Sequence, residues 1–319
     1  MARTRLWGAF RLVVSIGVLA VFLPRAAHLV SPLWKPATFL WLSAALAVTL
    51  IGVVLAALRW QRVLVALEMP RSLGTLLNHY LAGLFVSNLL PTTIGGDVLR
   101  VTRLSAQSGE RPRSFASVVL ERLTGWLVLP VISLVTLLIN PGLTRPPIDD
   151  ASHLVVLISL TTLALLGLIL YGASSERVGR RLRAQQGWMR FLGAVHLGLA
   201  RFRRSPAAAV EVLVVGFAYQ LAVVLSAFFA AKALGLPVSW TAVLAFMPAV
   251  AIVQVLPFPT IGGLGVREGA FVLFLHPLGV STGQAIALGL IVYGINVLAS
   301  LLGAPAFAAG TRPAAAVSA

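Results

Sequence analysis

The chain contains no cysteine, which excludes disulfides, thiolate metal sites and a cysteine nucleophile. Its five histidines are scattered, and none stands in an H-E-x-x-H or H-x-x-E-H arrangement, so no metal site is predicted. The sequence also lacks a G-x-S-x-G motif, a Walker A motif and a Rossmann fingerprint. We therefore expect no cofactor, no enzymatic activity and no ATP-driven pumping by this chain alone.

Charged residues are scarce as well, at 11% of the chain, while 59% of the residues are hydrophobic. A mean hydropathy of +0.95 is incompatible with a water-soluble domain. Residues 38–58 and 153–172 are continuously apolar rather than alternating, which favours membrane-spanning helices over a barrel. We predict an all-α polytopic membrane protein, with residues 1–319 forming one integral membrane domain.

Acidic residues are especially few, and the net charge of +16 rests almost entirely on arginine. A pI of about 11.8 is typical of nucleic-acid-binding proteins. In a membrane protein, however, basic residues concentrate in cytoplasmic loops for topological reasons. We prefer this second explanation and expect no nucleic-acid partner.

Hydropathy predicts six full membrane spans and two shorter apolar stretches. The spans are 6–24, 37–58, 114–139, 153–172, 210–231 and 284–309. The stretches 73–99 and 241–275 are each shorter than the roughly 40 residues that two crossings need, and proline and glycine interrupt them. We predict that both are re-entrant helical hairpins.

The arginines suggest an orientation in the cell inner membrane. A cytoplasmic N-terminus assigns to the cytoplasm Arg59, Arg62, Arg71, Arg103, Arg111, Arg113 and the eight arginines from Arg177 to Arg204. The outside then receives only Arg25, Lys35, Arg145 and Lys232. This distribution obeys the positive-inside rule with both termini cytoplasmic. Residues 1–27 also resemble a cleavable signal peptide, although we favour a retained anchor.

The segment 174–209 is basic and amphipathic. Its apolar residues recur every three or four positions, at Trp188, Leu192, Val195, Leu199 and Phe202. This spacing predicts a cytoplasmic helix lying on the anionic leaflet, with a solvated linker as the alternative.

Two segments share the pattern TIGGxxxR. Thr93, Ile94, Gly95, Gly96 and Arg100 match Thr260, Ile261, Gly262, Gly263 and Arg267 at a constant offset. Their flanking spans match too, so the repeated units are about 37–139 and 210–309, and the predicted topology makes them run in opposite directions. Inverted repeats with interrupted helices are typical of transporters.

Charged side chains within the predicted membrane zone are candidates for function, because each costs several kcal/mol there without a partner. They are Asp97, Arg100, Glu121, Arg122, Arg267 and Glu268. Arg100 and Arg267, about one turn into the helices after the two glycine pairs, suit a phosphate or carboxylate. The alternative is that they pair with neighbouring carboxylates. Glu121 suits either a gate or a salt bridge to a hairpin arginine.

Other residues of the two stretches add weaker signals. Asn88 and Gln254 can contribute hydrogen bonds to a cavity. The helix-breaking positions are Pro91, Gly95, Gly96, Pro259, Gly262, Gly263 and Gly265. They permit sharp turns and close backbone approach for a ligand, or simply closer helix packing.

The segments NLLPTTIGGDVLRVTRL, SVVLERLTGW and PTIGGLGVREGAF, in this order, resemble the lysylphosphatidylglycerol synthase transmembrane (flippase-like) family. That family includes the N-terminal flippase region of multiple peptide resistance factor. The resemblance implies that the charged and glycine residues of these motifs form the functional core. Family members often carry an acidic residue where this chain has Gly125, which puts a second carboxylate on that helix in doubt. The soluble synthase domain does not follow, so we expect no lipid synthesis by this chain.

These signals lead to a hypothesis with two alternatives. A flippase-like transporter would move an anionic or aminoacylated phospholipid, or a polyprenyl-phosphate-linked lipid, between leaflets. The first alternative is a non-transporting membrane partner of a glycosyltransferase or lipid synthase. The second is an integral membrane enzyme that uses Glu121, Asp97 or Glu268 as acid or base.

Overall fold

The computed structural model describes residues 35–89, 95–174, 189–254 and 265–310. In these ranges the chain is helical and has no β-strand, which confirms the predicted all-α class. The α-helices are α2 (Pro36–Ala66), α3 (Leu73–Leu89), α4 (Gly95–Ser108), α5 (Arg111–Ile139), α6 (Asp149–Ser174), α8 (Met189–Arg204), α9 (Pro206–Ala233), α10 (Trp240–Val253), α11 (Val266–Leu275), α12 (Thr282–Leu301) and α13 (Gly303–Ala308). Short 3₁₀ turns occupy Pro141–Thr144 and His276–Leu278.

Five of these helices, α2, α5, α6, α9 and α12, are long and apolar enough to cross a membrane. They match five of the six predicted spans, and the sixth, 6–24, lies outside the described residues. The predicted span 284–309 is interrupted after Leu301, where α13 begins at Gly303. A Cβ on Gly303 would overlap the Leu81 carbonyl, so the glycine lets α13 pack tightly on α3.

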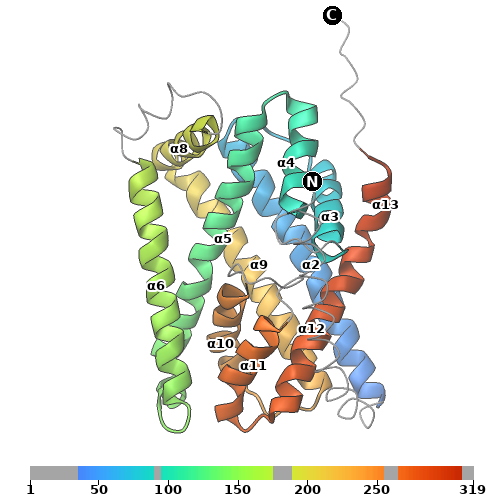
Figure 1. Ribbon diagram of the computed structural model, residues 1–319, viewed down its shortest axis with the longest axis vertical. Coiled ribbons are helices and arrows are strands. Elements are labelled where there is room, and N and C mark those ends of the chain that lie inside the picture. The colour runs from blue at the N-terminus through green and yellow to red at the C-terminus, as the bar shows by residue number, and fades with distance from the viewer. Residues whose placement is uncertain (1–34, 90–94, 175–188, 255–264, 311–319) are drawn as a thin grey trace, which may run out of the picture.

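Figure 1 shows α2 and α9 crossing in the middle of the bundle, where they pack along each other. Helices α3 and α4 pair at one end of the molecule, while α10 and α11 lie toward the opposite end. Helix α6 stands at the edge of the bundle, and α8 lies across the end that also holds the α4–α5 connection (Figure 1). The two predicted hairpin stretches therefore occupy opposite halves of the molecule.

Basic residues follow the same division. Most of the described arginines lie at one end of the bundle (Figure 1). They belong to the C-terminal ends of α2, α4 and α8 and to the start of α5, which meet there. The opposite end holds Lys35, Arg145 and Lys232, which stand in or beside the start of α2, the α5–α6 connection and the end of α9.

The apolar face of α8 packs on the protein. Ala194 and Val195 join a buried cluster with Val63 of α2 and Leu120 of α5. Gly198 permits this contact, because a Cβ there would overlap the Leu120 side chain. Part of the stripe predicted to face the leaflet is therefore used to hold α8 on the bundle.

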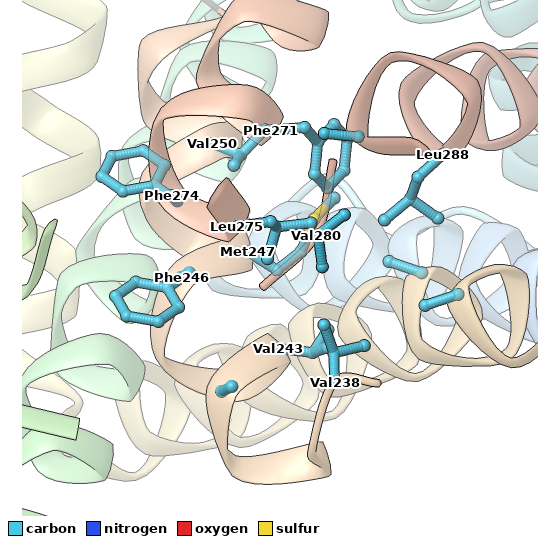
Figure 2. Packing of buried hydrophobic residues seen from close by; sticks show 14 of the residues in the cluster. Val238, Val243, Phe246, Met247, Val250, Phe271, Phe274, Leu275, Val280 and Leu288 are labelled. Atoms are coloured by element: carbon cyan, nitrogen blue, oxygen red, sulfur yellow. The ribbon is translucent and has the colours of Figure 1, made fainter. Parts of the chain in front are cut away.

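A buried hydrophobic cluster fixes α10 and α11 (Figure 2). The rings of Phe246 and Phe274 stack with their centroids 5.9 Å apart. Gly265 turns the chain into α11 with a φ of 88°, a backbone conformation that residues with a side chain rarely adopt. Its N–H donates to the Glu268 carboxylate over 2.5 Å, which caps the first turn. Arg267 is consequently the second residue of α11, nearer the helix start than predicted.

Candidate functional site

Glu121, on α5, is 1% exposed and lies between two arginines. Arg100, on α4, donates from both Nη1 and Nη2 to one carboxylate oxygen of Glu121, each over 3.2 Å. Arg59, on α2, donates from Nη2 to the other oxygen. Of the two roles considered for Glu121, the salt bridge to a hairpin arginine is thus present.

Arg59 corrects the predicted topology, which placed it in a cytoplasmic loop. It is buried within α2, because this helix continues beyond the predicted end at 58 to Ala66. Its guanidinium lies 4.9 Å from the centre of the Tyr219 ring and against Gly125 and Gly216. A Cβ on Gly125 would stand 2.5 Å from Arg59 Nη1, so the glycine makes room for this charge.

The Arg100 guanidinium contacts two aromatic rings and two carboxylates. Its guanidinium lies 4.2 Å from the Trp60 ring centre and 4.6 Å from that of Tyr80. It also donates to Asp97 over 3.3 Å, in addition to its bonds to Glu121. Cation–π contacts of this kind are strongest away from water, which is where this side chain lies.

Arg122 extends the cluster to the surface of the bundle. It pairs with Asp97 over 2.9 Å, and its side chain is 46% exposed. The cluster thus contains three guanidinium groups, from Arg59, Arg100 and Arg122, and two carboxylates, from Asp97 and Glu121. One positive charge is left in excess within this set.

The excess charge is accompanied by unused hydrogen-bond donors. Arg59 Nε and Nη1 and Arg100 Nε are buried and have no hydrogen-bond partner among the described residues. Buried donors without partners are unfavourable, and an uncompensated buried charge is more so. A phosphate or carboxylate from a ligand would satisfy both, whereas a metal cation would be repelled.

A cavity of about 440 Å³ adjoins the outer part of the cluster. It lies between α4 and α5, with Asp97, Arg111 and Arg122 among otherwise largely apolar walls. A site with a few charges and long apolar walls matches the chemistry of an amphiphile.

The other predicted pair forms separately. Arg267, on α11, donates from Nη2 to Glu268 over 2.7 Å, and both side chains are buried. The Arg267 guanidinium lies 4.9 Å from the Tyr293 ring centre on α12, and Gly289 leaves room for the Glu268 side chain. No ion pair among the described residues joins this pair to the Arg100 cluster.

The remaining predicted residues divide between packing and positions that the structure leaves undescribed. Asn88 donates to the Leu84 carbonyl of its own helix, and Gln254 is the C-cap residue that follows α10. Gly95 begins α4, and Gly96 crosses α3 so closely that a Cβ would overlap the Gly83 carbonyl. The helix-breakers Pro91, Pro259, Gly262 and Gly263 lie outside the described residues.

Comparison with known proteins supports the resemblance found in the motifs. A search of curated proteins gives no match to this chain. A family profile described as "Lysylphosphatidylglycerol synthase TM region" matches residues 8–303, a range that contains both charged pairs and the cavity. The chain belongs to the lysylphosphatidylglycerol synthase transmembrane region family.

Proposed function

We propose that this protein is a lipid flippase-like transporter, which moves an anionic or aminoacylated phospholipid or a polyprenyl-phosphate-linked lipid between leaflets of the inner membrane. The observation that carries the proposal is the surplus of guanidinium over carboxylate in the cluster of Arg59, Arg100 and Arg122, of which Arg59 and Arg100 are buried. A membrane-embedded positive charge is unfavourable alone, so a lipid phosphate that enters the cluster is stabilised there.

Pairing with carboxylates is compatible with this role. A lipid phosphate would compete with Glu121 and Asp97 for Arg100, and Glu121 would keep Arg59 as its partner when Arg100 turns away. The transported group thus replaces an internal ion pair and avoids a long passage through hydrocarbon without a partner. No covalent bond is made or broken in this process, so we propose transport and no enzymatic step.

We further propose that α3–α4 and α10–α11 are re-entrant hairpins of an inverted repeat. Their location in opposite halves of the bundle (Figure 1) supports this proposal. So do the arginine–carboxylate pairs on α4 and α11, the partly buried pair of Arg100 with Asp97 and the buried pair of Arg267 with Glu268. In this arrangement the arginine-rich end faces the cytoplasm, both termini are cytoplasmic and α8 lies at the anionic leaflet.

The experiment is lipid translocation in proteoliposomes. A fluorescent phosphatidylglycerol is bleached from outside by dithionite, with and without an applied ion gradient, in vesicles with the parent chain, Arg100→Ala or Arg267→Ala. Arg113→Ala is the matched control, because Arg113 is half-exposed and pairs only with Glu110 among the described residues. We expect both site variants to lose translocation and the control to keep it.

Two further results bear on the assignment. The conservative variant Arg100→Lys keeps the charge but loses the two guanidinium hydrogen bonds to Glu121, so we expect partial activity. Full activity of both alanine variants contradicts the site. Parent protein that moves neither this lipid nor a polyprenyl phosphate faster than empty vesicles contradicts the transport proposal itself.

A further inference from the structure

The cavity between α4 and α5 is a groove that runs along both helices. Its α5 wall includes Phe115, Val119 and Leu123, which recur at helical spacing and so form one continuous stripe. Its α4 wall includes Val98 and Val101. An apolar stripe of this length on two antiparallel helices is suited to a hydrocarbon chain.

An arginine lies at each end of the groove, Arg111 at one and Arg122 toward the other. Arg111 begins α5, at the arginine-rich end of the bundle, and forms no ion pair with any described residue. Arg122 lies eleven residues further along α5, which at a rise of 1.5 Å per residue is about 16 Å deeper. This depth is roughly half the thickness of the hydrocarbon core, which is about 30 Å. The groove therefore extends from the interface to about the middle of the membrane.

The groove also faces outward. Val98 is 58% exposed, and Trp126, at the deep end, is partly exposed as well. On a membrane-spanning bundle, exposed apolar side chains of this kind face lipid tails. A lipid in the groove can thus keep its tails in the bilayer while its head group contacts the protein.

We propose that this groove is the loading site for an anionic phospholipid of the leaflet at the arginine-rich end. The phosphate binds first at Arg111 and then moves inward to Arg122, while an acyl chain follows the stripe of Phe115, Val119 and Leu123. Charge complementarity selects this occupant, because two arginines face one carboxylate, Asp97, in the groove. The inference rests on the transport proposal and adds the route by which lipid reaches the buried cluster.

Photocrosslinking tests the groove independently of transport. The intact chain is placed in phosphatidylcholine vesicles that contain a phosphatidylglycerol with a diazirine in one acyl chain, and adducts are mapped by mass spectrometry. We expect adducts concentrated on α4 and α5 around Thr102 and Val119. The variant Val98→Trp fills the groove and should remove them, whereas Val214→Trp, at an exposed valine of α9, should not.

A second pair of variants tests the role of the Arg111 charge in binding the lipid phosphate. Arg111→Gln should reduce phosphatidylglycerol adducts about fivefold, as expected for one basic residue at a membrane surface, and leave adducts of a phosphatidylcholine probe unchanged. Arg113→Gln should leave both unchanged. Equal loss in the two variants, or equal loss with both lipids, overturns the role of Arg111.

The outcomes separate this inference from the transport proposal. Groove adducts without translocation leave the binding site standing and contradict transport. Translocation that persists in Val98→Trp contradicts the groove as the route. Adducts spread evenly over α6 and the groove, or absent from the groove as expected if it receives a protein helix, also overturn the loading site.

Discussion

At the scale of single residues, the charged cluster is organised by one carboxylate, which pairs with two buried arginines. Glu121 accepts hydrogen bonds from Arg59 of α2 and Arg100 of α4, two helices that both precede α5 in the chain. Buried ion pairs contribute little net stability compared with apolar packing, but removal of one partner leaves a charge without compensation. Glu121 therefore matters most as the carboxylate that compensates the charges of Arg59 and Arg100.

Substitution Glu121→Gln should destabilise the protein strongly. The amide neutralises the only carboxylate that contacts both Arg59 and Arg100 among the described residues, and breaking such a buried pair costs about 3–5 kcal/mol. Thermal unfolding in detergent measures the effect. Glu211→Gln, which affects an exposed pair with Arg62, is the control and should shift the transition little. Equal shifts for both variants would show that the cluster is solvated.

Gly125 allows a test of the surplus charge. A carboxylate introduced by Gly125→Asp would stand beside Arg59, so we expect it to neutralise the cluster and lower the translocation of phosphatidylglycerol. Gly125→Ala displaces Arg59 without adding charge and separates crowding from charge. Gly142→Asp, in the 3₁₀ turn between α5 and α6, where a Cβ meets nothing within 4 Å, is the control for an added negative charge. Unchanged transport in Gly125→Asp would exclude the surplus charge as the cause of anion binding.

At the scale of helices, the contact of α3 with α4 depends on two glycines. Gly83 and Gly96 bring the two backbones so close that a Cβ on Gly96 would meet both the Gly83 carbonyl and the Ser87 hydroxyl. This crossing positions Arg100 beneath Tyr80 of α3. Gly96 thus has a packing role, and it serves the charged cluster by setting where α4 lies.

Gly96→Ala should therefore separate α3 from α4 and lower both stability and translocation. The methyl group would press against backbone atoms, which cannot move aside as a flexible side chain can. Gly74→Ala in the same helix pair is the control, because a Cβ there meets nothing within 4 Å. Alanine is the better helix former by up to about 1 kcal/mol, so this control should be neutral or stabilising. A lower melting temperature for Gly74→Ala alone would contradict the packing assignment.

Prediction from the sequence succeeded where hydropathy alone decides. Five described spans and the split of each shorter stretch into two helices follow from apolar length and helix-breaking residues. Arg59 was missed because the apolar run ends just before it, and its partner Glu121 lies on a helix far along the chain. A local signal existed: Gly52, Ala56, Arg59 and Val63 share one buried face of α2, at the spacing of a helix interface. The α4–α5 groove depends on how two helices pack, which no periodicity in one segment reveals.

At the scale of the whole molecule, the division of basic residues between the two ends predicts a topology that can be measured. Cysteine can be introduced one position at a time, because the chain has none. Cysteines replacing Ser239 and Pro277 should react with a membrane-impermeant maleimide in intact cells. Those replacing Ala106 and Ser205, at the arginine-rich end, should react only after the membrane is opened. The reverse pattern would invert the bundle, and labelling of all four would contradict the spans.

Two hydrogen bonds from Arg103 link α4, which carries part of the charged cluster, to α13, the last described helix. Arg103 stands one turn after Arg100 on α4, and its Nη1 and Nη2 atoms donate to the carbonyls of Ala306 and Phe307 over 2.9 and 3.0 Å. Any rotation of α4 that draws Arg100 from Glu121 must also pull α13 along or break both bonds. A fluorophore on α13 should therefore act as a remote indicator of whether the arginine cluster is open or closed.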